Sequence, residues 1–158
     1  MFRLARRKNK VISDEAIAKL LNSERRGVLA VNGDEGYPYA IPVNYYYDET
    51  EQKIFFHGAR VGHKVDALKS SDKVCFTVYG NEAIKDLDWA PYMQSVVIFG
   101  RCHLMDDVTA ADKWLRKLAE KYYPNQESIE EEIAESGKAV QMYVIEIEHL
   151  SGKEIQER

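Results

Sequence analysis

Six β-rich runs follow one another along the chain, mostly in hairpin-like succession, and this pattern constrains the fold more than any other feature. The runs cover residues 27–32, 37–47, 53–57, 73–79, 95–105 and 140–148. Helical segments separate only some of them, so the strand-by-strand βαβ rhythm of a parallel sheet is missing. The pattern therefore predicts an α+β protein with a mainly antiparallel, six-stranded sheet that closes as a barrel and is flanked by helices.

The helical segments are marked by apolar spacing and by capping residues. The first segment begins at Ile12 and ends before Gly27, and the other three cover residues 61–70, 109–122 and 128–136. Ser13 is predicted to cap the first helix and Thr109 the third. In the run 37–47, Pro38 and Pro42 remove backbone donors, which favours an edge strand, a bulge or a kink. Gly100 marks a bend or bulge in the fifth run.

Length and composition indicate a single domain over residues 1–158. Hydrophobic residues make up 45% of the chain and charged residues 30%, which is the balance of a soluble globular protein. No apolar run approaches the 18 residues or so that a membrane-spanning helix needs. The two cysteines, Cys75 and Cys102, form neither a disulfide framework nor a zinc site. We expect buried free thiols and a cytoplasmic protein.

Charge is distributed unevenly. The first ten residues carry five basic side chains and no acid, whereas the whole chain has a net charge of −4. A basic arm of this kind can contact phosphates, but the acidic body repels nucleic acid, so nucleic-acid binding is not expected. No apolar core follows the arm, so it does not have the pattern of a signal peptide. The alternatives are a solvated tail or an arm that packs on an acidic neighbour.

The most informative segment for chemistry is 57–68, where a strand ends and a helix begins across two small residues. Free backbone N–H groups at a helix start attract anions. Arg60 and Lys64 are spaced by one helical turn, with His63 beside them, so the segment predicts a phosphate cradle. Neither a P-loop nor a dinucleotide-binding glycine motif is present. The alternative is an exposed basic helix start.

Two further features bear on a binding site. The kinked segment 40–45 could present backbone groups and the Asn44 amide to a planar ligand, although an ordinary bulged strand has the same pattern. The four histidines do not form a metal set, because His57 and His63 lack a carboxylate at ligand spacing.

Ordered motifs along the chain resemble the pyridoxamine 5′-phosphate oxidase-like flavoproteins, and among these the 5-nitroimidazole resistance (nitroimidazole reductase) branch. The motifs are P-V-N-Y at 42–45, F-F-H-G-A-x-x-G-x-K-x-x-x-L at 55–68, V-C-F at 74–76, S-V-V-I-F-G at 95–100 and S-G-K at 151–153. The resemblance covers about Asn9 to Lys153. It implies a split β-barrel, and a homodimer that binds FMN between its two subunits.

The resemblance also assigns residues to the cofactor. They are Val43, Asn44, Tyr45, His57, Gly58, Ala59, Arg60, His63, Lys64, Trp89, Tyr92, Ser95 and Val96. Residues 43–45 are expected beside the isoalloxazine ring, and residues 57–59 near its polar edge and the ribityl chain. Lys64, with Arg60 and His63, is expected to hold the phosphate.

The strand from Ser95 is expected to add flavin contacts, and Trp89 and Tyr92 to face the flavin of the partner subunit. His63 stands where the family often has arginine, and a neutral imidazole binds phosphate less strongly than a guanidinium does. The arginine-rich C-terminal segment of the true pyridoxamine phosphate oxidases is missing, so formation of pyridoxal phosphate is not expected.

The function that follows is an FMN-dependent oxidoreductase that passes electrons from a reduced nicotinamide, or another donor, to a small planar acceptor. A nitroimidazole-type reductase is its sharpest form. His57 is the candidate catalytic residue, as a proton donor or as a group that stabilises reduced flavin. A histidine that only forms hydrogen bonds is the alternative. Two other functions remain open, a non-enzymatic FMN-binding or storage protein and a haem-binding split barrel.

Overall fold

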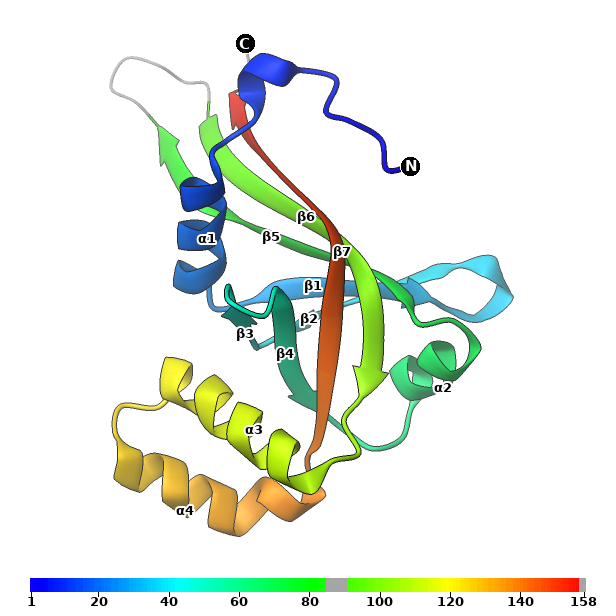
Figure 1. Ribbon diagram of the computed structural model, residues 1–158, viewed down its shortest axis with the longest axis vertical. Coiled ribbons are helices and arrows are strands. Elements are labelled where there is room, and N and C mark those ends of the chain that lie inside the picture. The colour runs from blue at the N-terminus through cyan, green and yellow to red at the C-terminus, as the bar shows by residue number, and fades with distance from the viewer. Residues whose placement is uncertain (85–90, 157–158) are drawn as a thin grey trace.

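The computed structural model describes residues 1–84 and 91–156, and its strands form one curled antiparallel sheet (Figure 1). The strands are β1 (Gly27–Asn32), β2 (Pro38–Val43), β3 (Tyr45–Asp48), β4 (Lys53–Gly58), β5 (Lys73–Ile84), β6 (Pro91–Leu104) and β7 (Gln141–Gln156), in the order β2-β1-β5-β6-β7-β4-β3. The helices are α1 (Asp14–Ser23), α2 (His63–Ser70), α3 (Val108–Tyr122) and α4 (Gln126–Ser136), with short 3₁₀ turns at Lys8–Lys10, Asp34–Gly36 and Gly137–Ala139. The predicted α+β class and antiparallel sheet are confirmed.

The predicted number of strands was wrong, because the sheet has seven strands instead of six. The run 37–47 divides at Asn44 into β2 and β3, which lie at opposite edges of the sheet. One residue therefore joins the two edges, and the sheet must curl until they approach each other. This arrangement is a split barrel. Both prolines of the run lie on the edge strand β2, where a missing backbone donor breaks no inner ladder.

Aliphatic and aromatic side chains from all seven strands fill the barrel, and α1 closes one end of it. Ile17, Leu20 and Leu21 of α1 are buried in this core. The Tyr45 hydroxyl donates a hydrogen bond to the Leu21 carbonyl at 2.7 Å, which fixes α1 to the start of β3. Gly152 permits this close packing, because a Cβ atom there would lie 2.5 Å from Ile17.

Helix α3 packs on the outside of the barrel and covers the split. The Trp114 ring stacks on Phe55 of β4 with their centroids 3.9 Å apart. At the end of the helix, the Tyr122 hydroxyl lies 2.9 Å from both the backbone N and the carbonyl O of Tyr45, and 2.7 Å from the Arg25 carbonyl. The hydroxyl accepts from the Tyr45 N–H and donates its single proton to one of the two carbonyls, so it provides partners for backbone groups at the split. Asp107 caps α3, and the helix therefore begins one residue before the predicted cap.

We expect Tyr122→Phe to lower the free energy of unfolding by about 1–3 kcal/mol, because it leaves the part-buried backbone N–H of Tyr45 without a partner. Urea denaturation measures this loss. Tyr123→Phe is the matched control, since Tyr123 is exposed, and we expect a change of about 0.5 kcal/mol or less. Equal losses in the two variants would show that the hydroxyl does not hold the split together.

Candidate functional site

Helix α2 is fixed at both ends, and this fixes the candidate anion site at its start. At the N-terminal end, the His63 ring stacks on Tyr39 with centroids 4.1 Å apart, and its Nε2 lies 3.7 Å from an Asp34 carboxylate oxygen. At the C-terminal end, the Asn32 amide donates to the Ser71 hydroxyl at 3.2 Å. Contacts to the β1–β2 hairpin therefore hold both ends of the helix.

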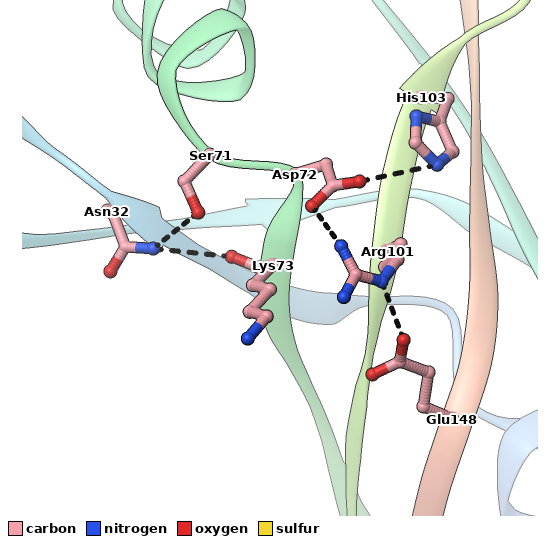
Figure 2. Close-up of polar contacts among 7 residues, drawn as sticks. All are labelled: Asn32, Ser71, Asp72, Lys73, Arg101, His103 and Glu148. Atoms are coloured by element: carbon pink, nitrogen blue, oxygen red, sulfur yellow. Dashed lines mark hydrogen bonds and ion pairs between the residues drawn. The ribbon is translucent and has the colours of Figure 1, made fainter.

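A polar cluster on the outer side of β5, β6 and β7 continues this anchoring (Figure 2). The Arg101 guanidinium donates to Asp72 at 2.8 Å and to Glu148 at 2.7 Å, and His103 Nε2 lies 3.7 Å from Asp72. Asp72 follows α2 directly, so the cluster connects the end of the helix to two long strands. Its place in the fold makes it structural.

Lys64 lies at the inner side of the barrel mouth, over two aromatic rings. Its Nζ is 4.7 Å from the centroid of Tyr143 and 5.5 Å from that of Phe56. The ammonium also occupies the space beside Gly58, where a Cβ atom would lie 2.5 Å from Nζ. Burial lowers the pKa of this ammonium, and Tyr143 donates to the Ala59 carbonyl, which fixes the turn before α2. We call these five residues the Lys64 cradle.

The structure does not bring Arg60 and His63 to the same point as Lys64. The helix begins at His63, because Gly62 with φ 127° is its N-cap, and Arg60 therefore precedes the helix. The Arg60 guanidinium donates to the carbonyls of Lys138 at 2.7 Å and Val140 at 3.4 Å. His63 turns toward the β1–β2 hairpin instead. The expected convergence of the three cations fails, since it assumed a continuous helix over 61–70.

His57 and Asn44 do come together. Side chains alternate along β4, so His57 points away from Gly58 and toward α3 and α4. There both residues line a cavity of about 180 Å³, whose other walls are mostly aliphatic residues of the two helices. Burial lowers the pKa of His57, and the positive charge of Lys64 lowers it further. The cavity thus combines aliphatic walls with polar groups, since Tyr122, Tyr123 and Glu132 line it together with His57 and Asn44.

Val43 and Tyr45 direct their side chains into the barrel core, where both are buried. The Tyr45 ring meets Phe76 edge to face at 5.2 Å, and burial raises the pKa of its phenol. Tyr122 already bonds the Tyr45 backbone groups. Of the segment 43–45, only the Asn44 side chain reaches a cavity, so a ligand beside this segment would contact Asn44 and backbone.

Tyr92, Ser95 and Val96 lie on β6, at the opposite end of the sheet from the Lys64 cradle. Val96 is fully buried in the barrel, and Ser95 is 7% exposed on the outer face. The Tyr92 hydroxyl donates to Glu154 at 3.1 Å. Trp89, which the resemblance placed with Tyr92, lies outside the described residues.

Sequence reasoning missed the two rings under Lys64. Phe56 and Tyr143 belong to adjacent strands and pair directly in the β4–β7 register, with ring centroids 4.9 Å apart. Each was visible as an aromatic residue in a β-rich run. Nothing in the local sequence shows that β4 pairs with β7, and this pairing is what places both rings beneath one lysine.

The described residues give no support for a metal site or for a membrane-spanning helix. In the part of the chain that the structure describes, no group of three or more histidine, cysteine or acidic side chains could hold a metal ion. Among the helices of residues 1–84 and 91–156, none has the length and apolar character that crossing a lipid bilayer requires.

Comparison with solved structures shows the same fold. A candidate 5-nitroimidazole antibiotic resistance protein from Bacteroides thetaiotaomicron matches 92% of this chain and 87% of its own length, with a TM-score of 0.77 and 18% identity. A conserved hypothetical protein from Mycobacterium tuberculosis matches 95% and 89%, with a TM-score of 0.79 and 18% identity. A FAD-binding protein from Mesorhizobium loti matches 92% and 97%, with a TM-score of 0.64 and 21% identity.

Comparison at the level of sequence gives the family. Among curated proteins, no relative matches this chain. The family model described as pyridoxamine 5′-phosphate oxidase matches residues 13–154, which is nearly the whole sequence. The chain therefore belongs to the pyridoxamine 5′-phosphate oxidase family.

Proposed function

We propose that this protein binds FMN as a homodimer and acts as an FMN-dependent oxidoreductase that reduces a small planar acceptor. The observation that carries the proposal is the Lys64 cradle, which presents a half-buried ammonium beside a glycine at the start of a helix. Family membership and the FAD-binding and nitroimidazole-resistance relatives support a flavin and an acceptor of this class. Cys75 and Cys102 are free thiols, which supports a cytoplasmic location.

The residues of the cradle fit a phosphate group. The first intrahelical bond of α2 runs from the Asp66 N–H to the Gly62 carbonyl, so the N–H groups of residues 63–65 have no partner within the helix. In the described residues, Lys64 contacts aromatic rings and forms no ion pair with an acid. Gly58 has no side chain, so no side chain at this position covers the Nζ of Lys64. The three N–H groups of residues 63–65 and the Lys64 ammonium are therefore available to bind an anion.

One chain cannot supply all the residues that the family resemblance assigns to a single flavin. Gly58 pairs with Gln141 on β7, whereas Ser95 pairs with Lys153 at the other end of the same strand. At about 3.3 Å per residue, roughly 40 Å of strand separates the two groups. A second copy, turned about a two-fold axis, would bring its Ser95 end to the cradle of the first. This separation supports a homodimer with two sites.

The outer face of the sheet offers the surface for such a partner. On β1, β2 and β5, six residues that point outward are small or apolar and carry no charge, namely Val28, Ala30, Ala40, Pro42, Cys75 and Thr77, whereas the outward-pointing residue at the start of β5 is Lys73. Ala40 and Pro42 are exposed and the other four are half-buried, in a chain in which charged residues make up 30%. Depletion of charge is typical of the centre of protein interfaces. We call these six residues the uncharged face and assign it to the second subunit.

His57 is the group that can deliver a proton in this site. Bound FMN would supply hydride-transfer chemistry, which none of the side chains can perform. His57 lies on β4, directly before Gly58 of the Lys64 cradle, and its imidazole lines the cavity shared with Asn44. The aliphatic residues of this cavity would give a small planar molecule apolar contacts beside the imidazole. We therefore assign His57 the role of proton donor to the acceptor.

We expect Lys64→Ala to weaken FMN binding by about ten- to a hundredfold, or 1.5–3 kcal/mol, because one charge-assisted contact to phosphate is lost. Fluorescence titration measures the affinity. Riboflavin lacks the phosphate, and its affinity should stay unchanged. Lys69→Ala is the matched control, since Lys69 is an exposed lysine of the same helix. Equal loss of riboflavin and FMN would place the phosphate elsewhere.

We expect Thr77→Lys to convert the dimer to monomers and to lower FMN affinity at the same time, because it places a charge on the uncharged face. Light scattering at micromolar concentration measures the mass. Ala134→Lys adds the same charge on an exposed position of α4 and should leave the dimer intact. A wild-type monomer that still holds FMN contradicts the proposed assembly.

We expect His57→Gln to lower the rate of acceptor reduction by ~10²-fold while FMN affinity stays nearly unchanged. Proton donation needs the imidazolium, so the wild-type rate is present at low pH and is lost as pH rises through the pKa of His57. Because burial lowers this pKa below 6.5, the decline should lie on the acid side of neutrality. The variant should show a flat profile, and His103→Gln should behave as wild type. An unchanged rate and profile in His57→Gln would remove the residue from the mechanism.

A further inference from the structure

A second hollow lies far from the Lys64 cradle, between the N-terminal arm and the outer side of β6 and β7. It is a groove of about 820 Å³, which is the size of a site for a dinucleotide or another large ligand. In Figure 1 the N-terminal segment runs beside the end of β7 at which the C-terminus lies. Val11 forms an isolated antiparallel β-bridge with Lys153, and the Ile12 N–H donates to the Gly152 carbonyl at 3.2 Å. The root of the arm is thus fixed to β7.

The charge of this groove is opposite to that of the rest of the chain. Its basic lining residues are Arg3, Arg6, Arg7, Lys10 and Lys153, and its acidic ones are only Asp14 and Glu154. The whole protein carries a net charge of −4. Within the residues that the structure describes, none of the five cations forms an ion pair. Several guanidinium groups along one wall provide the bidentate donors that phosphate groups accept.

The floor of the groove takes a flat ring. Phe99 and His149 are direct partners in the β6–β7 ladder, and both line the groove. The ring of Phe2 stacks on His149 with centroids 4.7 Å apart and on Phe99 at 5.9 Å, each with an interplanar angle of 10°. The ring of Phe2 therefore occupies this platform at the foot of the basic wall, and the base of a ligand would take its place by displacing it. A ligand with a flat base and adjoining phosphates matches both features.

We propose that this groove binds the adenosine diphosphate group of a nucleotide, with the phosphates against Arg3, Arg6 and Arg7 and the base on the Phe99–His149 platform. The groove is separate from the Lys64 cradle of the same chain and lies beside the strand from Ser95, which the proposed function brings to the flavin of the partner. Two nucleotides carry this group, a nicotinamide dinucleotide as electron donor and the adenosine half of FAD. The shared chemistry, and not either source, is what the groove recognises.

The test is calorimetric titration of ADP and of pyrophosphate into the flavin-loaded wild-type protein and into two double variants. Arg6→Ala/Arg7→Ala removes two lining cations. Lys8→Ala/Lys19→Ala removes the same charge from positions on the arm and on α1 that do not line the groove. We expect ADP affinity to fall at least about tenfold in the first and to stay within about twofold in the second. Phe99→Ala, an exposed position, should lower ADP affinity but not pyrophosphate affinity.

Equal losses in the two double variants would overturn the proposal, because general charge and not the groove would then bind the anion. Equal affinity of ADP and pyrophosphate in the wild type would also overturn it, since the platform would then contribute nothing. The same variants are also titrated with a nicotinamide dinucleotide, and in flavin-free form with FAD. The nucleotide whose affinity falls together with that of ADP is the one that the groove binds. If neither falls, the groove is not a dinucleotide site.

The outcome is independent of the Lys64 cradle. Lys64→Ala should lose FMN affinity and keep that for ADP, whereas the Arg6/Arg7 double variant should do the reverse. If wild-type protein fails to bind FMN, the titration of ADP into flavin-free protein still decides the groove. If ADP fails to bind and FMN binds, the proposed flavin function stands alone.

Discussion

The passage of the chain from one edge of the sheet to the other across the single residue Asn44 is the constraint on which the rest of the structure depends. Because β2 and β3 are joined so closely, the seven strands must curl until their edges approach. The edges do not pair as a ladder there, and their backbone groups need other partners. Tyr122 supplies them from α3, and Lys121 donates to the Tyr45 carbonyl at 3.2 Å. The helix is therefore part of the barrel wall and not an addition to it.

Because the sheet curls, the two faces of β4 lie in different surroundings, one toward the barrel and one toward the helices. Along β4, side chains alternate between the barrel and the helices, so neighbouring residues serve different environments. Gly58 faces the barrel mouth and leaves room for the Lys64 ammonium, whereas His57 opens into the cavity under α3 and α4. The proposed anion site and the proposed proton donor thus lie one residue apart in sequence on opposite faces of one strand.

Positive charge in this acidic protein is concentrated where anions would bind. The Lys64 cradle uses one cation in a half-buried setting, with rings that hold the ammonium in place. The groove beside the N-terminal arm uses several exposed arginines over an aromatic floor. Exposed charges are screened by salt more strongly than half-buried ones. If both proposals hold, binding in the groove should depend on salt concentration more strongly than binding in the cradle.

The sequence by itself determined the antiparallel class, the glycine turn before α2 and the family, because periodicity, capping and motif order are local properties of the chain. For the proline-containing run it left an edge strand, a bulge or a kink open, and the sheet order decided for the edge. The Gly100 bulge was also predictable, and the register of β6 and β7 does shift at that residue. Only the tertiary structure decided which side chains meet. Arg60 and His63 turn to the α4–β7 turn and the β1–β2 hairpin, while Phe56 and Tyr143 arrive beneath Lys64. Contacts of this kind depend on strand register and on packing between segments far apart in the chain, which residue spacing does not encode.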